Sequence, residues 1–192
     1  ASNETCATLK KDVPVITNAS IDSTSSAGGK IFVAWSKPTE LDTIQIPGPY
    51  RYLVARARSD APGTFMIADS LDNLNDTTWH DGNLNTADFH WLYRIDLYNV
   101  TPGNRFLVGS SQVASTIFLR GTPTDKKVVL YWNSDVPWIN HSFVVYRKDP
   151  GGSNFDSVGV TNVTTYTDAG LVNGLTYCYR IKSIGSYSAP GF

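Results

Sequence analysis

Glutamate is almost absent from this chain. Only two glutamates, Glu4 and Glu40, occur among 192 residues, against fifteen aspartates. Glutamate favours helices, whereas the asparagine, serine, threonine and glycine residues that separate the apolar runs favour turns between strands. The composition therefore argues against a helical protein and predicts many short strands joined by turns.

The chain also lacks a strong charge of either sign and any long hydrophobic run. Its formal net charge is −1, and no basic face predicts a nucleic-acid partner. No apolar run approaches the ~18 residues needed to cross a bilayer, so we expect no membrane insertion. Hydrophobic residues make up 41% of the chain, which is enough for packed cores.

One sequence pattern occurs twice, in the same order. The offsets between matching segments are 97, 91, 87 and 86 residues, and they shrink because the first copy has longer loops. Two matching modules of roughly a hundred residues indicate a tandem repeat. The matching segments are 30–35 with 127–132, 53–56 with 144–147, 77–81 with 164–168, and 93–95 with 179–181.

Apolar residues alternate with other residues in each copy, which is the period of a β-strand. Turn signals rich in glycine and proline separate these segments. About seven short strands per copy, without a helical period, predict a two-layer antiparallel sandwich. The predicted fold class is all-β, with two tandem immunoglobulin-like sandwiches. The clearest apolar faces are Ile31, Val33 and Trp35 in one copy and Val128, Leu130 and Trp132 in the other.

The second copy contains Leu171 six residues before Tyr177, followed by alternating apolar residues. This spacing resembles the tyrosine corner and strand F of fibronectin type III domains, in which a tryptophan on strand B completes the signature. The resemblance covers residues 13–192 and implies a structural core that includes Trp35, Trp132, Leu171 and Tyr177. The first copy departs from the pattern, because Leu84 is followed by Trp91 in place of the corner tyrosine, one residue later than the spacing predicts.

A narrower resemblance concerns large bacterial surface proteins that end in a gliding-motility-associated C-terminal domain. It rests on residues 13–18, 47–50, 85–88, 135–138, 155–159 and 177–179. Such proteins use the type IX secretion route and carry strings of fibronectin-like repeats. The resemblance implies an extracellular or outer-surface location, a link to gliding motility or adhesion, and neighbouring repeats of the same polypeptide as partners.

The same resemblance divides the chain into three parts. Residues 1–12 would end a preceding repeat or linker, 13–112 would form the first domain, and 113–192 the second domain with a truncated strand G. It also places Cys6 and Cys178 in different repeats, so we expect no disulfide between them.

No catalytic motif is present. The three histidines lack metal-ligand spacing, and no Gly-x-Ser-x-Gly elbow or phosphate loop occurs. The two glutamates lie outside the strand segments, so paired catalytic carboxylates are not expected. Aspartates between residues 71 and 89 offer oxygen ligands for calcium, but a dedicated loop spacing is absent and turn formation explains them better. We expect no enzyme activity, cofactor or metal.

Two functions remain open: a non-catalytic spacer or interaction segment, and a glycan- or protein-binding module accessory to an enzyme or adhesin. For binding, Trp138 in the loop after strand B could stack on a sugar, although packing against a neighbouring module is the alternative; residues 86–89 form a second candidate loop. Five Asp-Ser or Asp-Thr pairs resemble the O-glycosylation acceptors of the same bacterial group, although such pairs also make good turns. The candidate acceptors are Ser23, Thr43, Ser70, Thr77 and Ser157.

Overall fold

A computed structural model describes Glu4 and residues 13–187 of the chain. The chain divides into two compact units between Ala114 and Ser115, two residues after the predicted domain boundary. Cys6 and most of the predicted linker at 1–12 lie outside the described residues, as do residues 188–192. The described part contains only strands, turns and loops, and no helix that could cross a membrane.

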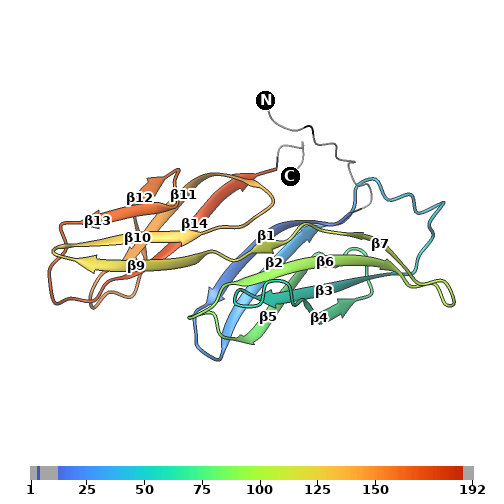
Figure 1. The fold of residues 1–192 in the computed structure, drawn as a ribbon, viewed down its shortest axis with the longest axis horizontal. Helices are drawn as coiled ribbons and strands as arrows, with labels where there is room; N and C mark the ends of the chain where they lie inside the picture. Colours follow the sequence, from blue (N-terminus) through green and yellow to red (C-terminus); the bar gives the residue numbers. More distant parts are fainter. Residues whose placement is uncertain (1–3, 5–12, 188–192) are drawn as a thin grey trace. The chain divides into compact units, whose positions relative to one another are not determined.

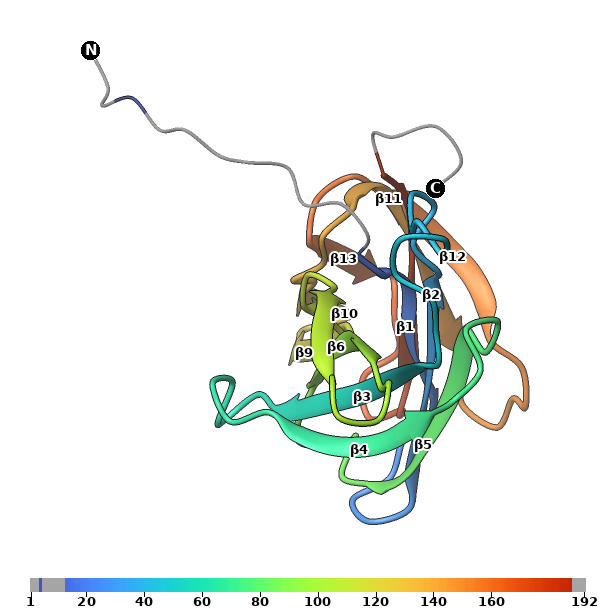
Figure 2. The ribbon, with the colours of Figure 1, turned by 90° about the vertical axis from the view of Figure 1, so that its right-hand side faces the viewer.

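The first unit contains two antiparallel sheets (Figure 1). One has the order β1–β2–β5, formed by Val15–Ser23, Gly29–Ser36 and Thr78–Leu84. The other has the order β4–β3–β6–β7, formed by Met66–Leu71, Tyr50–Arg58, Trp91–Asn99 and Phe106–Ser110. The two-residue strand β8 (Ala114–Ser115) also pairs with β6. Figure 2 shows β3 and β4 side by side in the second of these sheets.

The second unit repeats this plan with two sheets of three strands. One has the order β13–β10–β9, formed by Thr165–Ala169, Lys127–Asn133 and Phe118–Thr124. The other has the order β12–β11–β14, formed by Asp156–Thr161, Ile139–Lys148 and Cys178–Ser186. Among the described residues, β14 pairs with β11 on one edge and has no strand on the other.

A tryptophan joins the two sheets of each unit. Trp35 on β2 and Trp132 on β10 are each 3% exposed. Trp35 meets the ring of Tyr52 on β3 edge-on at 5.5 Å, and Trp132 meets Phe143 on β11 in the same way at 5.3 Å. Because each contact links an inner face of one sheet to that of the other, each unit is a β-sandwich. The predicted fold class is confirmed.

A buried carboxylate also links the two sheets of the first unit. Asp81 on β5 is 4% exposed. It accepts a hydrogen bond from the hydroxyl of Tyr93 on β6 at 2.9 Å and forms an ion pair with Arg56 on β3. Burial raises the pKa of Tyr93, and the charge of Asp81 raises it further. A carboxylate removed from water requires such partners, so these three side chains form a single polar cluster inside the sandwich.

The second unit contains the same cluster at the matching positions of the repeat. Asp168 on β13 is 5% exposed, accepts a hydrogen bond from the Tyr179 hydroxyl at 2.8 Å and pairs with Arg147 at 3.0 Å. Arg147 also holds Asp149 at 2.6 Å. These hydrogen bonds raise the pKa of Arg147, and the one to Asp149 contributes most. The repeat therefore preserves a hydrogen-bonded cluster as well as an apolar pattern.

The predicted tyrosine corner is present in the second unit, but Tyr177 is not a core residue. Leu171 is buried, whereas Tyr177 is half-buried and precedes the first residue of β14. The Tyr177 hydroxyl accepts a hydrogen bond from the backbone N–H of Val172 at 3.1 Å. Tyr177 therefore stabilises the loop that leads from Leu171 into β14. Its ring lies at the edge of the sandwich, where its hydroxyl can reach the backbone of that loop.

In the first unit a tryptophan forms the equivalent of the tyrosine corner. Its side chain donates a hydrogen bond to the backbone, whereas the Tyr177 hydroxyl accepts one. The indole N–H of Trp91 donates to the backbone carbonyl of Asn85 at 3.0 Å. Asn85 follows the buried Leu84, just as Val172 follows Leu171. An indole nitrogen only donates, so it requires a carbonyl where the phenol uses an N–H. The corner thus persists without its tyrosine.

Candidate functional site

The five predicted glycosylation positions lie on separate elements. Thr43, Ser70 and Ser157 are exposed, on a loop, on β4 and on β12 respectively. Ser23 at the end of β1 and Thr77 just before β5 are half-buried. The structure therefore separates three accessible hydroxyl groups from two that are partly covered by their own sandwich.

Trp138 is packed into the second unit. It is half-buried, and its indole N–H donates to Oδ1 of Asn140 at 3.1 Å. Its ring meets that of Tyr187 at 6.0 Å in an edge-on arrangement, and a β-carbon placed on Gly185 would lie 2.7 Å from its Cδ1 atom. These contacts cover the ring and satisfy its only donor, so Trp138 offers little of a flat platform for a sugar.

The second candidate binding loop, residues 86–89, is also held by contacts within the first unit. Thr86 is buried; its hydroxyl donates to the carbonyl of Ser23 at 2.9 Å and accepts from the N–H of Ser25 at 3.0 Å. Phe89 lies beneath the guanidinium of Arg58 at 4.3 Å. The loop thus fastens β5 to the turn between β1 and β2.

The acidic residues between 71 and 89 do not converge. Asp72 pairs with Arg51, Asp81 belongs to the buried cluster, and Asp88 binds the side chain of Asn85 at 2.8 Å. In the part of the chain that the structure describes, no group of three histidine, cysteine, aspartate or glutamate side chains could hold a metal ion.

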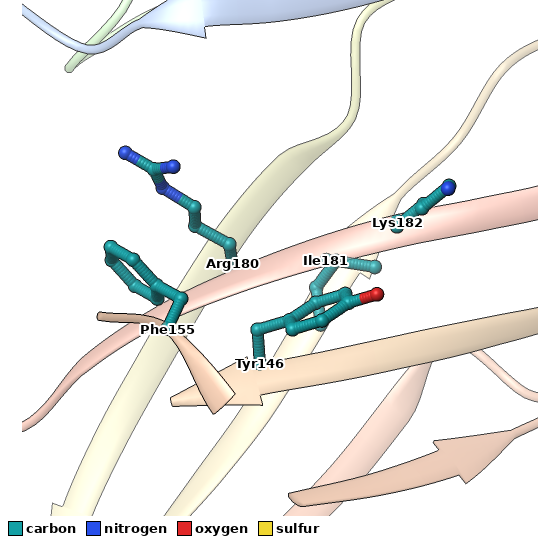
Figure 3. Close-up of a pocket in the computed structure, with 5 residues that line it drawn as sticks. All are labelled: Tyr146, Phe155, Arg180, Ile181 and Lys182. Carbon is teal, nitrogen blue, oxygen red and sulfur yellow. The ribbon is translucent and has the colours of Figure 1, made fainter. Parts of the chain in front are cut away.

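A shallow depression lies on the sheet β12–β11–β14 of the second unit. Figure 3 shows the five residues that line this depression. The depression has a volume of about 280 Å³. We call the outward surface around it the cationic aromatic face. The lining residues are Tyr146, Phe155, Arg180, Ile181 and Lys182.

Strand register brings these side chains together. Tyr146 on β11 lies directly opposite Arg180 on β14, and Val144 lies opposite Lys182. Successive side chains on a strand point to opposite faces, and Val145 next to Tyr146 is fully buried. The exposed positions Arg180 and Lys182 therefore share a surface with Tyr146 on the side of the sheet away from the core.

An aromatic ring holds one of the cations in place. The guanidinium of Arg180 lies over the ring of Phe155 at 4.2 Å (Figure 3). The ammonium of Lys148 lies 5.5 Å from the centre of the same ring. Stacking on a ring restricts the guanidinium while leaving its N–H groups in the plane able to donate. Phe155 therefore presents Arg180 in a preorganised position.

The positive charge on this face is not neutralised within the described residues. Neither β11 nor β14 contains an acidic residue, and Lys148, Arg180 and Lys182 form no ion pair there. The third strand of the sheet, β12, carries the exposed Asp156, which lies opposite Arg147 in the ladder. The nearby Asp149 and Asp168 are both held by Arg147. Such a face can attract a carboxylate or another anion, and it contains no nucleophile with an adjacent base.

The cationic aromatic face was not predicted from the sequence. The signal that could have predicted it lies in the residues that alternate with the core positions. Tyr146 and Lys148 occupy such outward positions on β11, and Arg180 and Lys182 occupy them on β14. Their proximity depends on the register of β11 against β14, and Phe155 joins them from the turn that follows Gly151 and Gly152.

No family model and no curated protein matches this chain. Solved structures that it resembles are arrays of fibronectin type III or related domains. The FN1–FN3 domains of chicken CNTN1 are 9% identical with a TM-score of 0.39, and the match covers 93% of this chain and 68% of that one. The central fibronectin-III array of RIM-binding protein is 16% identical with a TM-score of 0.32, covering 92% and 67%.

Domains A168–A170 of titin are 11% identical with a TM-score of 0.33, and the match covers 91% of this chain and 61% of the titin fragment. Similarity at this level says nothing about ligands or partners. The strand order and the contacts between sheets described above define two antiparallel β-sandwiches independently of these structures.

Proposed function

We propose that this chain is a non-catalytic spacer segment of two fibronectin type III-like modules in a large secreted or cell-surface bacterial protein. The observation that carries the proposal is the connection between the units. Only Thr116 and Ile117 separate β8 from β9, and residues 113–119 contain neither glycine nor proline. A connection of this length and composition restricts independent motion of the modules, which is the property a spacer needs.

The use of buried carboxylates supports a non-catalytic role. Among the described residues, the buried aspartates Asp81, Asp96 and Asp168 are each paired with an arginine. Each of these carboxylates is already bound by an arginine of its own sandwich, whereas a catalytic acid or base must reach a substrate. Their arrangement serves the stability of each module.

Small-angle X-ray scattering tests the spacer proposal. The wild-type chain should give a narrow distribution of distances between modules. A variant with six Gly-Ser residues inserted between Thr116 and Ile117 should give a visibly broader one. A wild-type distribution as broad as that of the insertion variant would rule out a stiff connection.

The cellular setting forms a separate part of the proposal. The resemblance noted in the sequence supports export by the type IX route to the outer surface, a role in gliding motility or adhesion, and O-glycosylation. Of the five candidate acceptors, the exposed Thr43, Ser70 and Ser157 should carry glycans more readily than the half-buried Ser23 and Thr77. Peptide mass spectrometry of the protein purified from such a bacterium tests this order, and unmodified peptides at all five positions would contradict it.

A ligand-binding module is the second candidate function. The observation that favours it is the cationic aromatic face, which combines unpaired positive charge with two aromatic rings around a depression. Trp138 and residues 86–89 no longer support this candidate, because their contacts hold each sandwich together.

A further inference from the structure

We propose that the cationic aromatic face binds a uronate unit of an acidic polysaccharide. The inference deepens the ligand-binding candidate and is independent of the spacer role. It assigns the carboxylate of the sugar to Arg180 and Lys182, and the sugar ring to the surface formed by Tyr146 and Phe155.

The first step in the argument is a comparison with the matching surface of the first unit. There Arg94 on β6 lies over the ring of Phe65 at 5.0 Å, as Arg180 lies over Phe155 in the second unit. Both arginines occupy the same position in the repeat, 86 residues apart. The two units therefore share an arginine stacked on a phenylalanine.

The second step concerns the residue two positions further along each strand. In the first unit it is Asp96, which binds Arg94 through two hydrogen bonds of 2.8 Å. In the second unit it is Lys182, so an internal carboxylate is replaced by a second cation. Arg180 and Lys182 stand about 6.6 Å apart along the strand, close enough for one anionic group to interact with both. The site in the second unit thus lacks the carboxylate that the first unit carries within itself.

The third step concerns the kind of carboxylate. The depression of about 280 Å³ lies just below the range of roughly 300–1,000 Å³ that is typical of small-molecule pockets, so it suits a single ring. The half-buried Tyr146 supplies an aromatic surface and a phenol that can exchange hydrogen bonds with sugar hydroxyls. A ring that carries both hydroxyl groups and a carboxylate, as a uronate does, matches all of these groups together.

Affinity measurements on the intact two-module chain test the proposal. Isothermal titration with polygalacturonate oligomers at low salt should show binding, and the affinity should fall as salt screens the ion pairs. Dextran represents a neutral glycan, dextran sulfate a polyanionic glycan without carboxylates, and polyglutamate an acidic peptide. All three should bind at least about tenfold more weakly than polygalacturonate.

Two substitutions examine the assigned contacts. Lys182→Asp restores the arrangement of the first unit, because the introduced carboxylate can pair with Arg180; affinity should fall by at least about tenfold, the loss expected for a charged hydrogen bond. Tyr146→Ala should lower affinity severalfold through the lost aromatic contact. Arg105→Ala is the matched control, because Arg105 is an exposed arginine stacked on Tyr98 at 4.7 Å in the first unit, and it should leave affinity unchanged.

Several outcomes would overturn the proposal. These are absence of binding to polygalacturonate, an unchanged affinity in the Lys182→Asp variant, or an equal loss in the Arg105→Ala control. Equal binding to dextran sulfate or polyglutamate would show a general anion surface or a peptide site instead. Thermal unfolding of each variant verifies that the fold is intact, and the scattering experiment on the spacer remains a separate test.

Discussion

The two modules differ most in strand F, which is β6 in the first unit and β14 in the second. The inward residues Tyr93, Ile95 and Leu97 of β6 are all 0% exposed. The matching residues Tyr179, Ile181 and Ser183 of β14 are only half-buried. β6 lies between β3 and β7, whereas β14 has a neighbour on one edge among the described residues. The comparison shows that the strands alongside an apolar strand decide how completely it is buried.

A second difference concerns surface charge. Both modules stack an arginine on a phenylalanine, but only the first places an aspartate two residues later to neutralise it. The buried Arg–Asp–Tyr cluster, by contrast, is the same in both. The two modules thus share the buried cluster but differ in the charge carried on the outward side of strand F.

The largest expected effect comes from truncating the core tryptophans. Trp35→Ala and Trp132→Ala should each cost about 3–5 kcal/mol of stability, the usual loss for a buried aromatic residue. The cost should be lower for Trp132, because the half-buried side chains around it can relax into the space more readily. Urea unfolding of the two-module chain, followed by tryptophan fluorescence and circular dichroism, measures both values. A larger loss for Trp132 would contradict the comparison.

An intermediate effect is expected from the buried carboxylates. Asp81→Ala leaves the Tyr93 hydroxyl without its acceptor and should cost about 1–3 kcal/mol. Asp168→Ala should cost less, because Arg147 retains Asp149 as a partner. The isosteric Asp81→Asn keeps one acceptor oxygen and serves as the control. Equal losses at both aspartates in urea unfolding would show that the second partner of Arg147 contributes nothing.

The last expected effect appears only in alkaline solution. Burial raises the pKa of Tyr52 to about 12 and raises that of Tyr93 as well. A phenol whose pKa is higher in the folded state stabilises the protein fully below the unfolded pKa of about 10, and this contribution is lost as the pH rises toward 12. The chain should therefore lose stability between about pH 10 and pH 12.

The tyrosine prediction also distinguishes a buried phenol from an exposed one. The Tyr52→Phe variant should lose less stability over this alkaline interval than the wild type. A matched Tyr131→Phe variant should behave like the wild type, because Tyr131 is 43% exposed in the second unit. Denaturant unfolding at a series of pH values measures both slopes. Identical slopes in the wild type and the Tyr52→Phe variant would contradict the assignment.

The sequence by itself determined the class and repetition of the fold. The alternation around Trp35 and Trp132 shows which side of each strand is apolar. The six-residue spacing from Leu171 to Tyr177 predicts a tyrosine corner in the second copy. Both are local properties of a strand and of the loop before it, so they can be read without knowing which strands are neighbours. The repeat offsets then show that the plan occurs twice.

Tertiary structure alone decided the polar clusters and the candidate site. Arg56, Asp81 and Tyr93 come from three strands, and Trp91 replaces the corner tyrosine because its N–H reaches the carbonyl of Asn85. The sequence left open whether Trp138 stacks on a sugar or packs against a neighbouring module, and in the structure its N–H donates to Asn140. The cationic aromatic face depends on the register between β11 and β14. Hydrogen-bond partners and charge clusters depend on how distant strands pair, and alternation within one strand contains no information about that pairing.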